Sequence, residues 1–372
     1  MEDRRNAVEP LFREFTSESL HLKNRIVMAP MTRGFSPQGI PSAQVADYYK
    51  KRADGGVGLI ITEGTLIDHK AASGHANVPQ IFGSKAIAGW KHVIQSVQGS
   101  GAKIIPQLWH VGNMRKPGTG PDPAVPAYGP MSISKSGQVQ TVGMSQADIK
   151  EVVEAYGNSA KTAFDIGFDG IEVHGAHGYL IDQFLWHETN QRTDGYGGSI
   201  ENRSRFAVEV VENIRQKVPG DFPVIFRFSQ WKLSAYDAKL ANTPEELERI
   251  LTPIKNAGVD VFHASSRRFF EAEFTRSPLN LAAWTKRVTG KPTITVGSIG
   301  LDSEMLTTAN KDWNGVSKVT NVHQAAAGVS DNNFDLVAVG RGLLGDPQWA
   351  NKVREGRFED IAAFSKQSLS EL

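Results

Sequence analysis

The segment FDGIEVHG, residues 168–175, is a short apolar run that stops at a polar side chain beside a glycine. Seven further runs share its enrichment in valine and isoleucine: RIVMAPM from Arg25, GLIITEG from Gly58, AKIIPQLWH from Ala102, PVIFRFS from Pro223, VDVFHAS from Val259, PTITVGS from Pro292 and FDLVAVGRG from Phe334. Most of them precede a longer stretch with helical spacing of apolar residues, for example residues 43–53 and 145–164. Buried strands that alternate with amphipathic helices are typical of a parallel sheet covered by helices. Eight such units predict an α/β fold of the (β/α)8 TIM-barrel type.

Two segments lie outside these eight units. Residues 11–24, LFREFTSESLHLKN, precede the first strand, and we expect them to form a hairpin that closes the bottom of the barrel. Residues 111–144, rich in glycine, proline and serine, follow the third strand as a long loop insertion. A loop of this length is usually functional, so we predict a lid over a site, with a merely decorative insertion as the alternative. We assign residues 1–372 to a single domain.

Composition excludes several classes of function. The 372 residues contain 41 Lys plus Arg and 40 Asp plus Glu, so bulk charge gives no reason to expect nucleic-acid binding. Cysteine is absent, which excludes disulfides, thiolate metal sites and a cysteine nucleophile. No apolar run has the ~18 residues of a membrane helix, and the N-terminus lacks the apolar core of a signal peptide. We therefore expect a cytoplasmic protein, monomeric or homodimeric, without a membrane partner.

The chemistry of such barrels sits at the carboxyl ends of the strands, and two of these ends are rich in glycine. The seventh strand ends in VGSIG, residues 296–300, and the eighth in VGRGLLGDP, residues 339–347. Gly297 and Gly340 allow backbone N–H groups to approach an anion closely, and Arg341 adds a fixed positive charge. Either glycine alone more often marks a tight turn. At adjacent strand ends they predict a phosphate site.

Gln107 and Arg227 project from strands in opposite halves of the predicted barrel. An amide and a permanent cation suit the pyrimidine edge of a flavin, because a cation stabilises the anionic reduced ring. The alternative is that Arg227 only pairs with a neighbouring carboxylate such as Glu63 or Glu172.

His174 and His177 follow the fourth strand at a spacing of three, with Tyr179 two residues further on. Zinc proteases with two histidines use a spacing of four on a helix, so the pattern disfavours a metal site. Two buried histidines satisfied by the backbone remain an alternative. The functional hypothesis is that both N–H groups hold a carbonyl oxygen while Tyr179, protonated at neutral pH, supplies a proton to a neighbouring carbon.

The sequence resembles the Old Yellow Enzyme family of flavin-dependent ene reductases along nearly its whole length. The resemblance rests on LFREFTSESLHLKNRIVMAPMTR from Leu11, VHGAHGYLIDQFL from Val173, NQRTDGYGGSIENRSRF from Asn190 and VAVGRGLLGDP from Val337. It implies bound FMN, with NAD(P)H as reductant, in contact with Pro30, Met31, Thr32, Gly64, Gln107 and Arg227 at the ring and Gly297, Ser298, Gly340 and Arg341 at the phosphate.

The resemblance also implies roles in substrate binding and catalysis. His174 and His177 match the pair that anchors the carbonyl oxygen, and Tyr179 matches the proton donor. Trp109 matches a residue of the classical branch that shapes the substrate pocket, and Thr32 stands where another branch has cysteine. His75 aligns with a pocket-lining tyrosine of many relatives.

The implied activity is reduction of the C=C bond of α,β-unsaturated carbonyl or nitro compounds, and phenols are expected as ligands. Independently of the resemblance, RRFFEAEF after the sixth strand offers Phe269 as a pocket wall or as plain packing. Two rivals remain: a barrel glycoside hydrolase that uses Glu63 and Glu172, and a flavoprotein that binds ligands without turnover.

Overall fold

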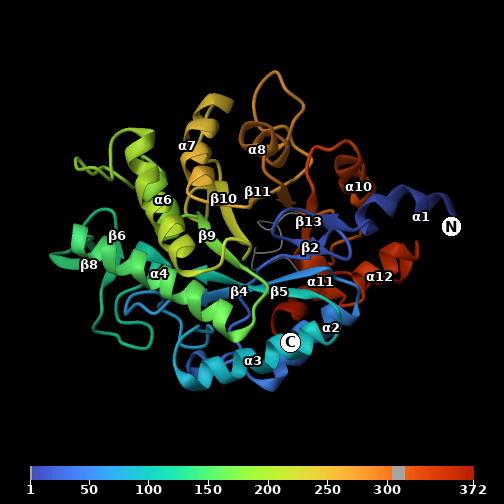
Figure 1. The fold of residues 1–372 in the computed structure, drawn as a ribbon, viewed down its shortest axis with the longest axis horizontal. Coiled ribbons are helices and arrows are strands. Elements are labelled where there is room, and N and C mark those ends of the chain that lie inside the picture. Colours follow the sequence, from blue (N-terminus) through green and yellow to red (C-terminus); the bar gives the residue numbers. More distant parts are fainter. Residues whose placement is uncertain (1, 304–314) are drawn as a thin grey trace.

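The computed structural model describes residues 2–303 and 315–372, and its centre is a closed barrel of eight parallel strands (Figure 1). The strands, in barrel order, are β3 (Ile26–Met28), β4 (Leu59–Leu66), β5 (Lys103–Trp109), β9 (Ile171–His177), β10 (Val224–Lys232), β11 (Val261–Ser265), β12 (Thr293–Val296) and β13 (Leu336–Val339). Each coincides with one of the eight predicted runs. The predicted (β/α)8 barrel is therefore confirmed.

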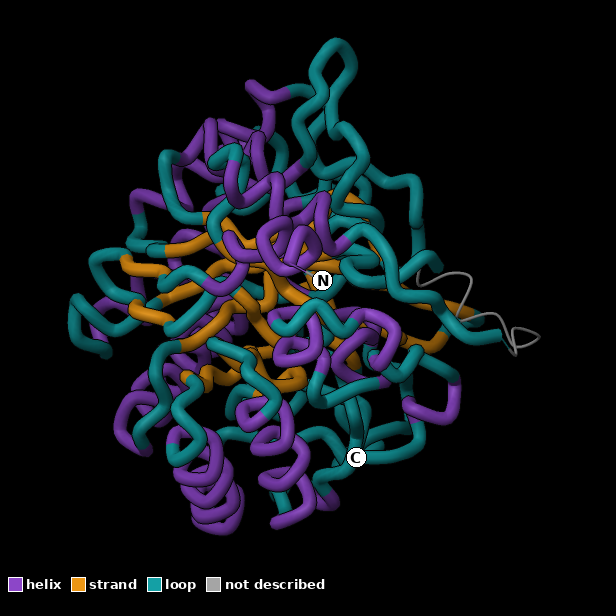
Figure 2. Tube along the Cα trace, turned by 90° about the vertical axis from the view of Figure 1, so that its right-hand side faces the viewer, coloured by secondary structure: helices purple, strands orange, loops and turns teal. Residues whose placement is uncertain are grey.

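Helices surround the barrel on its outer side, as the tube in Figure 2 shows. They are α1 (Glu2–Val8), α2 (Ala43–Asp54), α3 (Ser84–Gln98), α4 (Gln146–Ile166), α5 (Leu180–Leu185), α6 (Ile200–Lys217), α7 (Pro244–Asn256), α8 (Leu281–Thr289), α10 (Val322–Ser330), α11 (Arg341–Gly345) and α12 (Trp349–Arg354). Short 3-10 turns cover Glu9–Phe12, Pro37–Gly39, Gly112–Met114, Phe358–Asp360 and Lys366–Leu369.

Side-chain caps fix where three of the longer helices, α4, α6 and α7, begin. Ser145 and Asp148 form a reciprocal capping box at α4, and Ser199 accepts from the backbone N–H of Asn202 at α6. Thr243 caps α7, with Pro244 in its first turn, as the sequence predicts. These caps define the residue at which each connecting loop ends and the helix begins.

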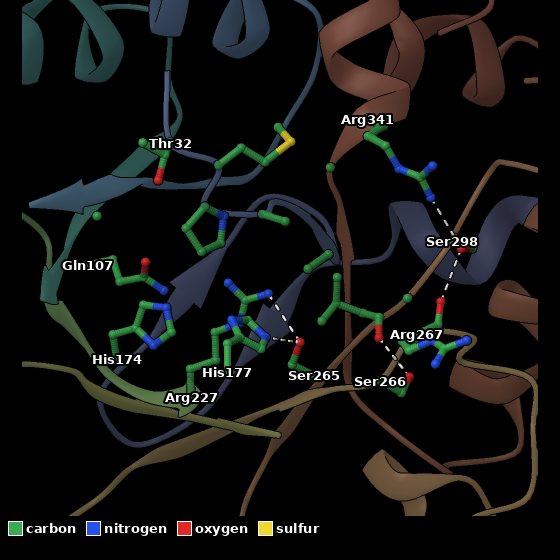
Figure 3. A pocket seen from close by; sticks show the side chains of 18 of the residues that line it. Thr32, Gln107, His174, His177, Arg227, Ser265, Ser266, Arg267, Ser298 and Arg341 are labelled. Carbon is green, nitrogen blue, oxygen red and sulfur yellow. Dashed lines mark hydrogen bonds between the residues drawn. The ribbon is translucent and has the colours of Figure 1, made fainter. Parts of the chain in front are cut away.

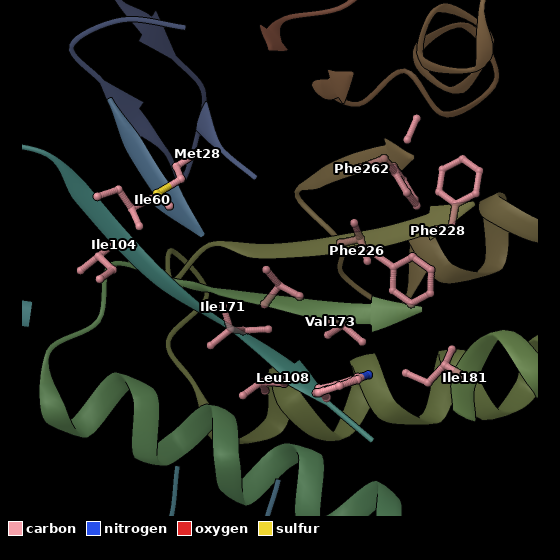
Figure 4. Close-up of a cluster of buried hydrophobic side chains, with 14 of the residues drawn as sticks. Met28, Ile60, Ile104, Leu108, Ile171, Val173, Ile181, Phe226, Phe228 and Phe262 are labelled. Atoms are coloured by element: carbon pink, nitrogen blue, oxygen red, sulfur yellow. The ribbon is translucent and has the colours of Figure 1, made fainter. Parts of the chain in front are cut away.

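Two apolar clusters hold the barrel together. The larger lies between the strands and the helices and includes Phe226, Phe228 and Phe262 (Figure 4). The smaller fills the barrel interior, where Phe15 and Leu22 pack against residues that begin the strands, such as Ile225. Phe15 and Leu22 belong to the hairpin of β1 (Phe15–Thr16) and β2 (His21–Leu22). The hairpin therefore closes the amino-terminal end of the barrel, as predicted.

The insertion after β5 forms a small sheet of its own on the flank of the barrel. Its strands are β6 (Ala127–Gly129), β7 (Ile133–Lys135) and β8 (Gln138–Gly143). Arg192 holds it in place by donating to the carbonyl oxygens of Pro130 and Met144, at 2.9 and 2.7 Å. Within the described residues no helix combines the length and the apolarity that crossing a bilayer requires.

Candidate functional site

A cavity of about 390 Å³ opens at the carboxyl ends of the strands, and its wall includes residues of seven strands and the residues directly after β3 (Figure 3). Its size suits an organic cofactor or substrate. The structure brings into this wall every predicted cofactor residue, together with Trp109 and the triplet from β9: Pro30, Met31, Thr32, Gly64, Gln107, Trp109, His174, His177, Tyr179, Arg227, Gly297, Ser298, Gly340 and Arg341. Residues up to 311 positions apart in the sequence thus line one space.

The glycine-rich strand ends form one side of the cavity, where cationic side chains gather. Gly297 has φ +146°, and a Cβ there would lie 2.6 Å from the carbonyl oxygen of Ser266, so no other residue fits. Arg341 donates to Ser303 O at 2.8 Å and to Ser298 Oγ at 3.3 Å. Arg267, a second guanidinium in the cavity wall, was not predicted, although it belongs to the RR pair that follows β11. Backbone amides and two guanidinium groups suit an anion such as a phosphate.

Gln107 and Arg227 lie on another part of the wall (Figure 3). Gln107 donates from Nε2 to Glu172 Oε1 at 2.7 Å, which orients the amide and leaves its carbonyl oxygen as an acceptor. Arg227 donates from Nη2 to Ser265 Oγ at 3.3 Å, and its buried Nε has no hydrogen-bond partner among the described residues. The alternative in which Arg227 merely pairs with a carboxylate is therefore wrong. The guanidinium group of Arg227 lines the cavity without an ion pair to a described carboxylate.

The carboxylates of the rival glycosidase hypothesis are used elsewhere. Glu63 accepts from the backbone N–H groups of Arg33 and Gly34, at 2.8 and 3.0 Å. Glu172 accepts from Gln107 and contacts His263 Nδ1 at 2.6 Å. Their residues are 1% and 0% exposed, and neither lines the cavity. Among the described residues no pair of carboxylates lines the cavity to flank a glycosidic bond, and the hypothesis of a glycoside hydrolase that uses Glu63 and Glu172 is rejected.

The triplet from the end of β9 is compact. The ring centroids of His174 and His177 are 5.2 Å apart, and those of His174 and Tyr179 are 4.9 Å apart. Burial, reinforced by the charge of Arg227, lowers the pKa of both histidines well below the usual range, so both are neutral at physiological pH. Burial also raises the pKa of Tyr179 to about 12, which keeps its hydroxyl protonated. The wall therefore offers neutral donors and a retained proton.

Hydrogen bonds indicate which ring nitrogen carries each proton. The backbone N–H of Ala176 donates to His174 Nδ1 at 3.3 Å, so the neutral ring carries its proton on Nε2. His177 Nε2 lies 2.8 Å from Ser265 Oγ, which also accepts from Arg227. If the Ser265 hydroxyl donates to Nε2, the proton of His177 resides on Nδ1. Each imidazole then retains one N–H that donates to no described residue.

Two predicted substrate contacts lie outside the cavity. His75 is exposed on a surface turn, where its backbone N–H donates to Ser73 Oγ. Phe269 is 2% exposed and packs edge-on against Phe270, with ring centroids 5.6 Å apart, and it does not line this cavity. Trp231 lines the cavity instead and lies against His177, with ring centroids 4.4 Å apart. The sequence offered residues 229–244, SQWKLSAYDAKLANTP, as lining the pocket or only its rim, but it did not single out Trp231, because the apolar run was expected to end at Ser229.

The lid prediction for the insertion is wrong. Residues 111–144 are all described, and none of them lines the cavity. Side chains from the end of the chain, Phe364 and Leu369, line it instead. Arg33 fastens this segment by donating from Nη2 to the carbonyl oxygen of Ser368 at 3.0 Å. The spacing of apolar residues could not predict that the end of the chain lines the cavity, because this segment is short and irregular.

One cavity thus gathers the glycine-rich strand ends, the pair Gln107 and Arg227, and the histidine–tyrosine triplet, which is the arrangement that the sequence predicts for a flavin-dependent oxidoreductase. Residues 10–317 match the model of the NADH:flavin oxidoreductase / NADH oxidase family. The chain belongs to this family, which confirms the predicted family and cofactor class. The family, together with relatives named NADH oxidase and NADPH dehydrogenase, supports FMN as the cofactor and NAD(P)H as the reductant.

Relatives of known sequence and structure agree with this assignment. NADH oxidase of Thermoanaerobacter brockii is 35% identical over 94% of the chain, and the chain spans 52% of that relative's length. 12-Oxophytodienoate reductase 7 of Oryza sativa is 31% identical over 95% of the chain and 90% of the relative. Morphinone reductase in complex with tetrahydroNAD superposes with a TM-score of 0.78, at 28% identity over 96% of this chain and 93% of that one. The chain thus spans about half of the first relative but nearly all of the other two.

Proposed function

We propose that the protein is an FMN-dependent ene reductase that uses NAD(P)H to reduce the C=C bond of α,β-unsaturated carbonyl or nitro compounds. The observation that carries this proposal is that His174, His177 and Tyr179 share one cavity with the flavin-edge and phosphate-cradle residues. Small molecules of this kind, with phenols as unreactive ligands, are the proposed partners.

The residues present fit FMN. A Cβ on Gly340 would lie 3.2 Å from Met31 Sδ, so the backbone there admits a close approach, and Arg341 stands beside it. Arg227 lines the same cavity, and its buried Nε has no hydrogen-bond partner among the described residues. When bound, FMN would supply the hydride acceptor and donor that connect NAD(P)H to the substrate's β-carbon. Thr32, Gly64 and Gln107 would contact its ring.

The remaining steps belong to the side chains of the protein. His174 Nε2–H and the free N–H of His177 would hold the substrate oxygen, where negative charge accumulates as hydride reaches the β-carbon. Neutral imidazoles suit this task because each can donate a hydrogen bond, and without a positive charge they do not attract a competing anion. Tyr179 would then give its phenolic proton to the α-carbon. Trp109 and Trp231 lie against the histidines and exclude water from the same wall.

Removal of the Arg341 charge tests the phosphate cradle. We expect Arg341→Met to weaken FMN binding by about 10- to 100-fold, the value of a charge-assisted hydrogen bond. Riboflavin, which lacks the phosphate, is the matched control ligand, and its affinity should change little. Fluorescence titration of the flavin-free protein measures both. Equal losses for the two flavins would assign Arg341 to general packing.

The pH profile tests the protonation states. Tyr179 donates a proton, and its pKa lies at about 12, above the ordinary ~10. The donor is therefore present at lower pH and is lost only as pH rises toward that value. We expect the rate of enone reduction by the reduced enzyme to stay level between roughly pH 7 and pH 10. A rate that falls through pH 8 to 9 would exclude Tyr179 as the donor.

Turnover separates an enzyme from a flavoprotein that only binds ligands. Purified protein should be yellow and release FMN on denaturation. With oxygen excluded, NADPH or NADH consumption should depend on added 2-cyclohexenone and match the cyclohexanone formed. A protein that binds phenols but shows no enone-dependent consumption would be the non-enzymatic alternative.

A further inference from the structure

The turn that carries His177 and Tyr179 has an unusual backbone. His177 has φ +65° and Gly178 has φ +83°, so two consecutive residues adopt left-handed conformations. A histidine rarely does so, and such a conformation persists only where its surroundings hold it. The contacts that hold this turn therefore decide where the His177 ring and the Tyr179 hydroxyl point.

At least five hydrogen bonds hold the turn. Two lie within the β9–α5 segment, where Gln183 Nε2 donates to the Gly178 carbonyl oxygen at 2.6 Å and the Tyr179 N–H donates to the Ala176 carbonyl oxygen at 3.2 Å. The other three involve residues at the end of β10 or the carboxylate of Asp182. The His177 backbone N–H donates to Ser229 Oγ at 2.9 Å, and its carbonyl accepts from the backbone N–H of Leu233 at 3.2 Å. Gly178 N–H donates to Asp182 Oδ2 at 2.6 Å. An irregularity in the β9–β10 register makes the two bonds of His177 possible, because β10 advances from Phe228 to Lys232 while β9 advances only from Gly175 to His177.

Asp182 is in turn held by Lys232. Lys232 Nζ donates to Asp182 Oδ1 at 2.7 Å and to Ser229 O at 3.1 Å, and both side chains are 0% exposed. Neither residue lines the cavity. A buried ion pair is seldom needed for stability, since apolar side chains of similar volume often stabilise a fold as well or better. Its position directly behind the turn points to a role in orientation.

We propose that Asp182 and Lys232 are positioning residues, whose ion pair fixes the Gly178 N–H and thereby presents His177 and Tyr179 to the substrate. This inference rests on the proposed function, because it concerns the geometry of the same triplet. Lys232 fixes the carboxylate, the carboxylate fixes Gly178, and Gly178 joins the two residues that touch the substrate. Ser229 completes the arrangement, since it accepts from His177 and its carbonyl accepts from Lys232.

Two double variants isolate the contact to Gly178. Lys232→Met/Asp182→Asn removes both charges but leaves an amide oxygen that can accept from Gly178 N–H. Lys232→Met/Asp182→Leu removes the charges and the acceptor. We expect the variant with leucine to bind p-chlorophenol at least about tenfold more weakly than the parent, the value of a lost hydrogen bond, and the variant with asparagine to stay within about threefold. The probe is the charge-transfer absorbance of the phenol on the FMN-loaded protein.

Half-reactions give the second readout. In the leucine variant, oxidation of the reduced enzyme by 2-cyclohexenone should slow by roughly 10- to 100-fold, as for a displaced catalytic group, while reduction by NADPH is retained. In a Tyr179→Phe background the same double substitution should cost less, because residues that act through one another are not additive. A purely structural role would give equal costs in both backgrounds.

A matched control is the ion pair between Lys286 and Asp335, 2.9 Å apart at the amino-terminal ends of the strands. Asp335 also accepts from a backbone N–H, that of Thr293. Lys286→Met/Asp335→Leu should lower the melting temperature and leave phenol affinity unchanged.

The outcomes distinguish this inference from the proposed function. If the parent reduces no enone, the proposed function fails first. If the parent is active and the leucine variant keeps parental phenol affinity, only the positioning assignment is overturned. Failure of both double variants to fold would also overturn it, since the pair would then serve the fold as a whole.

Discussion

The Tyr179→Phe protein should retain NADPH-dependent flavin reduction and lose most of its ability to reduce 2-cyclohexenone. The substitution removes only the phenolic hydroxyl from a largely buried ring that lies 4.9 Å from His174 and 5.0 Å from Trp109, centroid to centroid. Loss of a positioned general acid slows its step by about 10² to 10⁴-fold. Rapid mixing of the reduced enzyme with enone measures that step separately.

The matched control for this variant is an alkene with a more strongly electron-withdrawing substituent. A strongly activated nitroalkene stabilises the negative charge itself, so its reduction should suffer less from the loss of the Tyr179 proton than that of the enone. Phenol affinity should also stay near the parental value, since the histidines are intact. Equal loss in the reductive and oxidative halves would remove Tyr179 from the role of proton donor.

Replacement of His174 or His177 by alanine should produce the second large effect. Each substitution would remove one N–H donor to the substrate oxygen. The loss of an oxyanion donor lowers the rate of the chemical step by about 10² to 10³-fold. We expect phenol binding and enone reduction to weaken together, because both depend on the same oxygen contact. Difference spectra with p-chlorophenol and the oxidative half-reaction measure the two quantities.

Asparagine is the informative control at these positions. An asparagine side chain can still donate an N–H from a similar place, so His177→Asn should retain more phenol affinity than His177→Ala. Parental affinity in the alanine variants would assign the histidines to packing alone. FMN content should be unchanged in every variant, since neither histidine belongs to the predicted cofactor contacts.

Periodicity predicted the barrel because every strand is a continuous apolar run bounded by polar or glycine residues. The closing hairpin was predictable too, since Phe15 and Leu22 had to be buried somewhere before the first strand. The positions of the cavity residues followed from the fold, because the carboxyl ends of barrel strands converge on one space. That is why residues from Thr32 to Arg341 could be grouped without any long-range contact being visible.

Other features depend on tertiary geometry that no local pattern encodes. His75 lies on an exposed turn, although its alignment suggested the pocket. Trp231 and Lys232 were not singled out within residues 229–244, because the bulge in β10 extends the strand beyond its apolar run. The insertion at residues 111–144 packs on the flank, and the end of the chain reaches the cavity instead. The assignment to a single domain, the cytoplasmic location and the monomeric or dimeric state stay predictions.

One cavity is proposed to hold the flavin and to admit first the reductant and then the alkene. The experiment that decides this is reduction of the FMN-loaded protein with one equivalent of NADPH without oxygen, followed by addition of 2-cyclohexenone. We expect the yellow absorbance of oxidised flavin to return, with a matching amount of cyclohexanone, and p-chlorophenol to compete with the enone. Flavin that stays reduced in the presence of enone, yet is reoxidised by oxygen, would exclude the proposed ene reductase.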